Sequence, residues 1–213
     1  MSKLILFQGD SITDGGRIRT NDWDLNHQMG HSYPFLINAK LGSEYPEKDF
    51  RFINRGISGN RIADLFGRWK EDTLNHSPDI LSILVGVNDA YFHTHNNSGS
   101  LADRYEKIYQ LLIDEAKENN PDIKIVICEP FALSVKDKED FIENIMVYLK
   151  PMQEKAKLIA ERNNAIFIPL QKIFDEAAEK KETEYWIWDG VHPTVCGHQL
   201  IANEWLKYCK DIL

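Results

Sequence analysis

Short apolar runs rich in β-branched residues recur along the chain and alternate with longer segments of helical period. A run of this kind between turn residues is typical of a buried strand, because a strand covered on both faces has no polar side to alternate with. Five such strands are predicted, at residues 4–7, 50–53, 80–85, 123–128 and 165–168.

The segments between these strands place apolar residues three and four positions apart, which is the spacing of one helix face. The clearest case is the set Leu101, Tyr105, Ile108, Leu112 and Ala116. A last helix is expected after Pro193, with the apolar residues Leu200, Ile201, Trp205 and Leu206. The alternation predicts an α/β fold in which a parallel sheet lies between two helix layers, a three-layer α/β/α sandwich.

Length and charge narrow the classes of partner. The chain has 213 residues, which favours a single domain over residues 1–213. Its formal net charge of -8 repels phosphate backbones and anionic lipid headgroups, so neither nucleic acid nor a membrane is an expected partner.

A cytoplasmic location is expected from two features. The apolar run at residues 4–7 is too short for a signal-peptide core, and no run of about 18 apolar residues offers a transmembrane helix.

The three cysteines, Cys128, Cys196 and Cys209, lack the close spacing of a zinc or redox motif and suggest free thiols in a reducing compartment. Cys128 lies in an apolar run and is interpreted as a buried hydrophobic residue.

Polar motifs directly follow the first three predicted strands. They are Gly9-Asp10-Ser11, the segment of residues 54–60, and Gly86-Val87-Asn88-Asp89. In parallel sheets, ligands bind beyond the carboxyl ends of the strands, so these three loops are expected to converge on one edge of the sheet.

A nucleophile and a base are available in two of the motifs. Ser11 follows a strand, where its hydroxyl can reach a substrate, and Asp189 precedes His192 by three positions in the loop before the last helix. Asp189 could accept a hydrogen bond from His192 Nδ1 and leave Nε2 aimed at Ser11. Taken singly, Gly9-Asp10-Ser11 is more often an ordinary turn that caps the next helix, and the segment of residues 189–193 is equally typical of an Asp-Gly turn before a helix-starting proline.

Attack on an ester carbonyl builds negative charge that must meet preorganised donors. The side chain of Asn88 and the backbone amides of Ser11 and Gly59 are the candidates for such an oxyanion hole. The alternatives are a turn residue at Asn88 and a helix-start glycine at Gly59.

Together, and in this order along the chain, these motifs resemble the four sequence blocks of the SGNH, or GDSL-type, hydrolases. The resemblance spans nearly the whole chain and implies a flavodoxin-like sheet of five parallel strands. It implies Ser11 as nucleophile, His192 and Asp189 as the remainder of a catalytic triad, and Ser11, Gly59 and Asn88 as the oxyanion hole. No metal or organic cofactor is implied. The first block continues with Ile12-Thr13 in place of the leucine of the older family name.

A finer resemblance, to the carbohydrate acetylesterases including acetylxylan esterases, is carried by three segments: residues 10–14, residues 56–60 and Trp188. It implies a serine esterase that removes small acyl groups, above all acetyl, from a small-molecule ester such as an acetylated oligosaccharide after uptake. A lipase-, lysophospholipase- or thioesterase-like acylhydrolase is the alternative. A non-catalytic binding module would require one of the catalytic residues to be missing, and none is.

Two residues, Asp10 and Trp188, are candidates for substrate binding. Trp186 and Trp188 flank Ile187 beside the Asp189 loop, where packing is an equally good interpretation. The polar segment of residues 15–31, with Arg17, Asn21, Trp23 and His27, is expected to be a long loop that either lines the substrate cleft or is a surface loop. The alcohol and acyl groups, the chain-length preference and the state of homo-oligomerisation stay open.

The histidines offer one further hypothesis, a zinc hydrolase that uses His93 and His95 with His192 and His198. It is disfavoured, because His93 and His95 are expected in an exposed loop with no carboxylate or cysteine at ligand spacing beside them. No metal site is therefore predicted.

Overall fold

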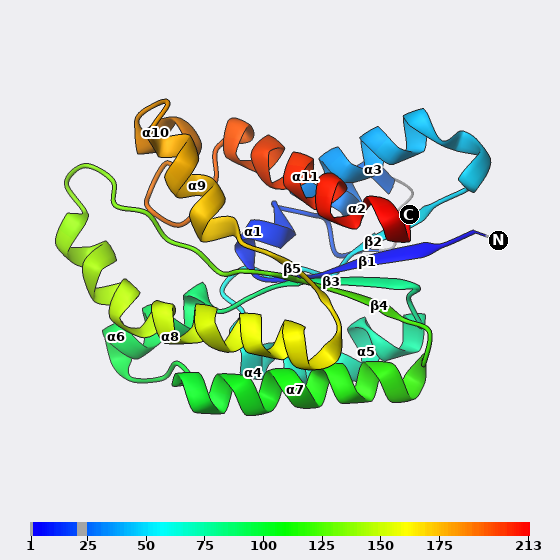
Figure 1. Ribbon diagram of the computed structural model, residues 1–213, viewed down its shortest axis with the longest axis horizontal. Coiled ribbons are helices and arrows are strands. Elements are labelled where there is room, and N and C mark those ends of the chain that lie inside the picture. Colours follow the sequence, from blue (N-terminus) through cyan, green and yellow to red (C-terminus); the bar gives the residue numbers. More distant parts are fainter. Residues whose placement is uncertain (1, 21–24) are drawn as a thin grey trace.

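The computed structural model describes residues 2–20 and 25–213, in which a parallel sheet lies between two layers of helices (Figure 1). Its strands are β1 (Leu4–Gly9), β2 (Arg51–Asn54), β3 (Ile80–Leu84), β4 (Lys124–Cys128) and β5 (Ile166–Ile168). All neighbouring strands pair in parallel, in the order β2-β1-β3-β4-β5, which is the flavodoxin-like order. The predicted α/β sandwich is confirmed.

Each predicted strand overlaps an observed one. The burial of the strands explains why apolar runs in the sequence predicted them. Every residue of β1 and β3 is buried, because both strands lie inside the sheet and are covered on both faces. β2 forms an edge of the sheet and exposes Arg51. A continuous apolar run therefore marks the central strands more clearly than the edge strand.

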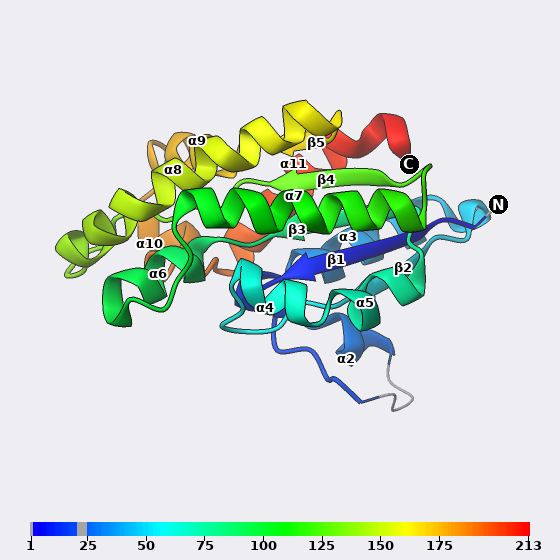
Figure 2. The same ribbon diagram turned by 90° about the horizontal axis from the view of Figure 1, so that it is seen from below.

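The helices divide between the two faces of the sheet (Figure 1). One layer contains α3 (Tyr33–Glu44), α9 (Leu170–Ala178), α10 (Thr183–Trp186) and α11 (Val195–Cys209); the other contains α4 (Ile62–Gly67), α5 (Trp69–Asp72), α6 (Val87–Asn96), α7 (Ala102–Asn119) and α8 (Glu139–Asn163). Figure 2 shows α7 lying along the sheet in the second layer. Two short helices, α1 (Ser11–Asp14) and α2 (Leu25–Met29), follow β1.

The apolar face predicted for α7 is largely correct. Tyr105, Leu112 and Ala116 are buried, whereas Ile108 is only partly buried. Leu101 was wrongly placed on this face: it precedes the helix and is 52% exposed. Spacing alone could not show that the helix begins one residue later.

The last helix, α11, packs its aromatic side chain against the first strand. Trp205 is fully buried and its ring lies 5.6 Å from that of Phe7 in β1, centroid to centroid. Its indole N–H donates to Ser82 Oγ of β3 over 3.0 Å, which satisfies the buried donor. These contacts hold the end of the chain against the centre of the sheet.

The longest helix among the described residues, α8, has 25 residues. No helix within residues 2–20 and 25–213 is both long enough and apolar enough to cross a membrane.

The carboxyl ends of β1, β2 and β3 meet at one edge of the sheet, as predicted. The strand register pairs Phe7 with Asn54 and Gly9 with Leu84. The residues that follow these positions are consequently brought side by side, although they lie tens of positions apart in the sequence.

Adjacent leucines of α7 provide a matched test of its register. Leu112 is fully buried and Leu111 is 42% exposed. Replacing Leu112 by Ala should lower the free energy of unfolding by about 2–5 kcal/mol, because it removes buried apolar contacts and leaves a cavity. Leu111→Ala should change it by no more than about 0.5 kcal/mol. Urea denaturation of both variants checks the pair, and equal losses would contradict this helix orientation.

Candidate active site

The turn after β1 presents Ser11 at the edge of the sheet. Asp10 is the N-cap of α1: its Oδ1 accepts a hydrogen bond from Ile12 N over 3.0 Å, which starts the helix directly at Ser11. Asp10 is 1% exposed, and Ser11 is partly exposed. The motif at residues 9–11 therefore buries the carboxyl group of Asp10 inside the protein and presents the hydroxyl of Ser11 at the surface.

Ser11, His192 and Asp189 lie in one hydrogen-bonded line. Ser11 Oγ is 2.8 Å from His192 Nε2, and His192 Nδ1 is 2.7 Å from Asp189 Oδ2. The other carboxylate oxygen, Asp189 Oδ1, accepts from the backbone amides of His192 at 2.7 Å and Val191 at 3.0 Å. The three residues named from the sequence are thus brought together at hydrogen-bonding distance.

The charges in this line fix where the imidazole proton lies. Burial raises the pKa of Asp189, but the hydrogen bonds from the His192 ring, His192 N and Val191 N outweigh it and lower that pKa to about 2. Asp189 is therefore a carboxylate at neutral pH and can only accept, so His192 Nδ1 carries a proton. In the neutral imidazole, Nε2 is then left as the acceptor for the Ser11 hydroxyl.

The same carboxylate favours the protonated ring. The hydrogen bond to Asp189 raises the pKa of His192 above 6.5, against the opposing effect of burial, and the charge of Asp10 adds to the rise. Burial raises the pKa of Asp10 itself to about 7. A positive charge that forms on His192 when it accepts a proton is accordingly stabilised chiefly by Asp189, and to a smaller extent by Asp10 when that carboxyl is ionised.

The loop that carries Asp189 and His192 is held by its backbone. Trp188 N donates to His192 O over 3.1 Å, and Leu133 N donates to Gly190 O over 2.9 Å. Gly190 has a φ of 97°, and a β-carbon there would collide with Ile142 Cδ1. The glycine between the acid and the base therefore lets the loop pack tightly against the neighbouring segment.

The predicted oxyanion donors come from the ends of three different strands. Ser11 follows β1, Gly59 follows β2 and Asn88 lies in the first turn of α6, after β3. Asn88 Nδ2 donates one hydrogen bond to Asn60 O over 3.1 Å, which anchors the amide and leaves its second N–H available. Gly59 has a φ of 81°, and no atom lies within 4 Å of a β-carbon built there. This backbone faces open space that a substrate could occupy.

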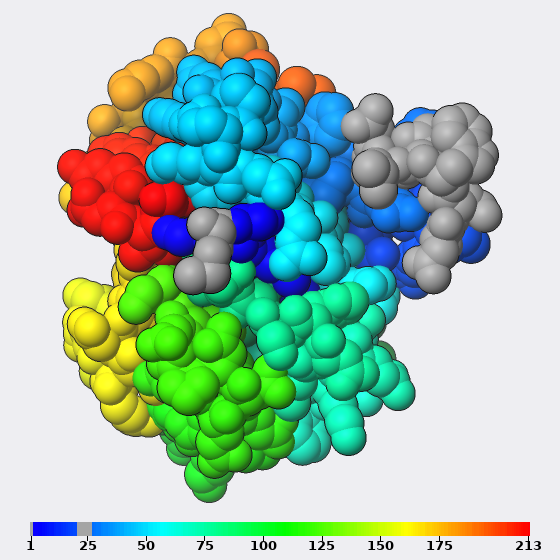
Figure 3. Space-filling view, turned by 90° about the vertical axis from the view of Figure 1, so that its right-hand side faces the viewer, coloured from blue at the N-terminus to red at the C-terminus, as the bar shows by residue number. Residues whose placement is uncertain are grey.

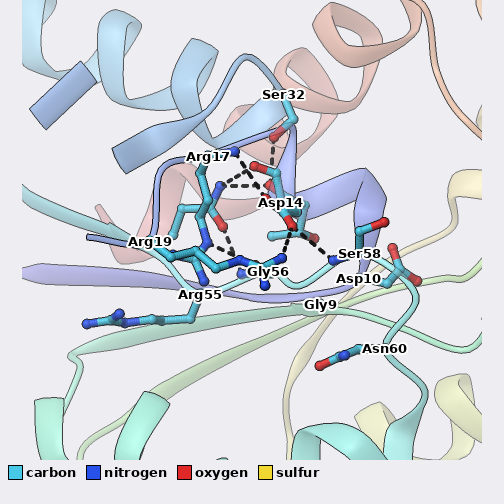
Figure 4. Close-up of polar contacts among 12 residues, drawn as sticks. Gly9, Asp10, Asp14, Arg17, Arg19, Ser32, Arg55, Gly56, Ser58 and Asn60 are labelled. Atoms are coloured by element: carbon cyan, nitrogen blue, oxygen red, sulfur yellow. Dashed lines mark hydrogen bonds and ion pairs between the residues drawn. The ribbon is translucent and has the colours of Figure 1, made fainter. Parts of the chain in front are cut away.

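Asp14, which the sequence interpretation left without a role, ties two of these loops together (Figure 4). Its carboxylate is buried and accepts from the backbone amide of Ser58 over 2.9 Å and from that of Arg17 over 3.1 Å. Arg17 Nε donates to Gly56 O over 2.9 Å. The segment before Gly59 is thus attached to the turn after Ser11.

A second buried acid, Asp89, likewise connects two segments by accepting hydrogen bonds from backbone amides. Its Oδ2 accepts from the backbone amide of Ile62 over 2.8 Å and its Oδ1 from that of Ser100 over 3.3 Å. Burial raises the pKa of Asp89 to about 6. The residue next to Asn88 consequently fastens α6 to the start of α4.

The two tryptophans beside the triad loop differ in environment. Trp186 is partly buried and packs against the hydrophobic core. Trp188 is 61% exposed, and its ring stacks on that of His192 with a centroid distance of 5.7 Å and an interplanar angle of 22°. Trp188 therefore supplies an exposed apolar surface next to His192.

The predicted long loop at residues 15–31 contains α2, and the positions of Asn21 and Trp23 lie outside the described residues. Its two ends meet, because His31 N donates to Gly15 O over 3.0 Å. Within this segment, α2 lies next to β2 at the edge of the sheet (Figure 2).

The expected exposed loop around His93 and His95 is wrong, since both residues lie in α6. His95 stacks on Tyr91 at 4.5 Å and His93 lies against Tyr148 at 4.4 Å, so aromatic packing continues the helix where the polar sequence suggested a loop. His198 is buried, and burial lowers its pKa to about 4. In the described parts of the chain, no group of three or more His, Cys, Asp or Glu side chains is placed to hold a metal ion.

Comparisons with known proteins agree on one family. The model of the GDSL-like lipase/acylhydrolase family matches residues 7–200. An acetylxylan esterase of Geobacillus stearothermophilus is 32% identical over 208 residues, which cover 95% of this chain and 92% of the relative.

Solved structures similar to this one include a GDSL-like lipase and acetylxylan esterases. A crystal structure of a protein described as a GDSL-like lipase, from Parabacteroides merdae, is 37% identical with a TM-score of 0.89, covering 98% of this chain and 96% of that one. A mutant of Axe2, an acetyl-xylooligosaccharide esterase of Geobacillus, is 31% identical with a TM-score of 0.86, covering 97% and 93%. Three other Axe2 structures are described as catalytic mutants, with a serine, an aspartate or a histidine replaced by alanine.

The pKa of His192 offers a test of the geometry that does not require activity. Asp189→Asn retains a hydrogen-bond acceptor but removes the negative charge, so the imidazolium loses its main stabilising partner and the pKa of His192 should fall below its wild-type value. An NMR titration of the ring measures both proteins. Asp103→Asn, at a side chain that is 86% exposed on α7, is the matched control and should leave the pKa unchanged. An unaltered titration in Asp189→Asn would contradict the contact.

Proposed function

The chain belongs to the GDSL-like lipase/acylhydrolase family and is a carboxylic ester hydrolase, and from that premise we propose that Ser11, His192 and Asp189 are its catalytic triad, with acetylated oligosaccharides as substrates. The single observation that carries the triad is the hydrogen-bonded line from Ser11 Oγ through the His192 ring to Asp189 Oδ2. A serine hydroxyl needs such a base to become a nucleophile at neutral pH.

In the proposed acylation step, Ser11 Oγ attacks the acyl carbon while His192 Nε2 takes the hydroxyl proton. The tetrahedral intermediate collapses when the same proton passes to the leaving alcohol oxygen, which leaves the acyl group on Ser11. Water then attacks this acyl-enzyme with His192 again as base, and the acid departs as the hydroxyl of Ser11 is restored. Asp189 remains ionised throughout and stabilises the imidazolium.

The negative oxygen of both tetrahedral intermediates would be held by the amides of Ser11 and Gly59 and by the side chain of Asn88. Support comes from the second N–H of Asn88, which its bond to Asn60 O leaves available, and from the open space at Gly59. Anchored donors cost little reorganisation when charge develops, which is the condition for effective stabilisation.

The substrate class is proposed from two independent features. The acetylxylan esterase relative and the acetyl-xylooligosaccharide esterase structure favour acetyl groups on xylose oligomers. Trp188 offers an exposed indole face beside His192, and flat aromatic surfaces suit the apolar face of a sugar ring. Asp10 would act on this substrate only through its charge, because its side chain is buried.

Action in the cytoplasm, on oligosaccharides that have already been taken up, is the proposed setting. Its support is the state of the cysteines, since Cys128, Cys196 and Cys209 are all free. Free thiols are usual where the compartment is reducing.

A substrate panel with a nucleophile variant tests the proposal. The wild-type protein should release acetate from acetylated xylooligosaccharides and from p-nitrophenyl acetate, and Ser11→Ala should lower kcat by roughly 10⁴- to 10⁶-fold with an unchanged Tm. Turnover retained in Ser11→Ala would refute the nucleophile. A marked preference for lysophospholipids, acyl thioesters or long-chain esters would refute the acetylesterase assignment and leave the triad standing.

Replacing Trp188 by Ala tests its place in sugar binding. Loss of the stacking surface should raise KM for acetylated xylooligosaccharides by about 3- to 10-fold and leave KM for p-nitrophenyl acetate nearly unchanged, because the small ester has no sugar to stack. Tyr185→Ala, at a neighbouring side chain that is 44% exposed, is the control and should change neither value. Equal rises for both substrates would instead indicate that Trp188 serves to position His192.

A further inference from the structure

A largely buried guanidinium lies between the ends of the first two strands. It belongs to Arg68, at the junction of α4 and α5, whose side chain is 13% exposed. Its Nη2 donates to Gly9 O at the end of β1 over 3.2 Å, and its Nη1 donates to Arg55 O, directly after β2, over 2.8 Å. One side chain thus connects the two strands that lead to Ser11 and to Gly59.

The same guanidinium also reaches the loop next to the proposed oxyanion donors. Its Nε donates to Asn60 Oδ1 over 2.7 Å, and the backbone oxygen of Asn60 accepts from Asn88 Nδ2 over 3.1 Å. Asn60 directly follows Gly59 in the chain. Two of the proposed donors, the Gly59 amide and the Asn88 side chain, are therefore adjacent to the residue that Arg68 holds.

The carbonyl oxygen of Gly9 is a shared acceptor at this point. Besides Arg68 it accepts from the backbone amide of Ile57 over 3.1 Å, and Ile57 O accepts from Asn60 N over 3.1 Å. The turn that ends at Asn60 is thereby attached to the end of β1 both by its own backbone and by Arg68. Ser11 follows Gly9 by two residues, so the position of its amide, the third proposed donor, depends on the same contacts.

The segment from which Arg68 extends is itself fixed. Asp72, at the end of α5, accepts from Arg68 Nη1 over 2.9 Å. Gln8 Nε2, from β1, donates to Asp72 O over 3.2 Å and to Thr73 Oγ1 over 2.8 Å. Burial lowers the pKa of Arg68, and the hydrogen bond to Asp72 opposes this effect. The guanidinium is therefore held in one orientation and can in turn fix the groups that it contacts.

An arginine suits this place because its planar guanidinium points several donors in fixed directions at once. The nitrogens of Arg68 serve acceptors on the end of β1, on the residue after β2 and on Asn60. A lysine ammonium has the same charge but is a single point on a flexible stem, so it cannot bind all of these acceptors together. The charge of this side chain and its geometry can therefore be separated by substitution.

We propose that Arg68 is a positioning residue for the oxyanion hole, a role that rests on the proposed ester hydrolysis because it concerns the donors of that mechanism. Arg68 holds the Asn60 side chain against the ends of β1 and β2, and Asn60 anchors the amide of Asn88. The donors at Gly59 and Asn88 are in this way kept in register with Ser11. Donors already in place need no reorganisation when the oxyanion forms, so a small displacement of them slows the reaction.

Steady-state kinetics of Arg68→Lys with p-nitrophenyl acetate test this role. The variant keeps the positive charge but loses the planar arrangement of donors, so kcat should fall roughly 10- to 100-fold while KM changes by less than about 2-fold. This split is expected because the donors hold a charge that is absent from the bound ester. An unchanged kcat in folded Arg68→Lys would overturn the proposal.

Arg162→Lys is the matched control. Arg162 is an ion-paired arginine of α8, whose Nη2 donates to Glu106 over 2.8 Å. It lies near the C-terminal end of α8, which is yellow in Figure 3 and belongs to the side of the protein on which β1 begins, away from the proposed catalytic groups. This variant should retain the wild-type kcat and KM. An equal fall of kcat in both arginine variants would show a general effect of the replacement and would overturn the assignment.

A double variant tests whether Arg68 acts through the oxyanion donors. One donor is already absent in Asn88→Ala, so the further loss of kcat that Arg68→Lys causes in this background should be several-fold smaller than in the wild type. A merely structural contribution would instead multiply with the loss from Asn88→Ala. Equal fold losses in the two backgrounds would therefore contradict the positioning role.

Asn60→Ala provides a second measurement should Arg68→Lys fail to fold. It removes the acceptor of Arg68 Nε but retains the backbone oxygen that binds Asn88, so kcat should again fall while KM is unchanged. Wild-type kcat in Asn60→Ala would overturn the proposal.

Ser11→Ala, assayed in parallel, separates this role from the proposed function. Turnover that persists in Ser11→Ala refutes the nucleophile itself. Full turnover in Arg68→Lys and Asn60→Ala, beside an inactive Ser11→Ala, refutes only the positioning role of Arg68.

Discussion

The hydrogen bond between Ser11 Oγ and His192 Nε2 joins two positions that are 181 residues apart, and the remainder of the fold serves to keep that distance at 2.8 Å. Ser11 is positioned by β1, an interior strand whose pairing with β2 and β3 fixes its register in the sheet. His192 depends on α11, whose Trp205 rests on Phe7 of the same strand. Both the nucleophile and the base are thus positioned by β1. This shared support explains how two groups so distant in the sequence keep a hydrogen bond that a small displacement would break.

Buried carboxyl groups perform the finer adjustment. Asp10, Asp14 and Asp89 all belong to the motifs that carry the family resemblance, yet each is hidden and accepts backbone amide hydrogens that a turn would otherwise leave unpaired. Side chains of this kind fix the loops without contacting a substrate. The motifs of this family are therefore mixtures of chemistry and scaffolding, with Ser11 and Asn88 turned to the surface and the neighbouring acids turned inward.

The sequence was most informative where one physical requirement dominates. β1 and β3 are covered on both faces, so each is marked in the sequence by an unbroken apolar run. Because polar motifs directly follow the predicted parallel strands, the sequence also indicated that the loops carrying these motifs meet at one edge of the sheet. Sequence spacing was less informative where several weak effects compete. His93 and His95 read as a polar loop because their aromatic partners, Tyr148 and Phe141, come from a distant helix.

The most direct measurement of the central claim is covalent labelling of the protein with an organophosphate ester such as paraoxon, followed by peptide mass spectrometry. Such a reagent transfers its phosphoryl group to a serine that is activated by a neighbouring base. The account predicts one adduct, on Ser11, that forms rapidly in the wild-type protein and is lost when His192 is replaced by Ala. An adduct on a different serine, or labelling of Ser11 that proceeds equally well without His192, would contradict it.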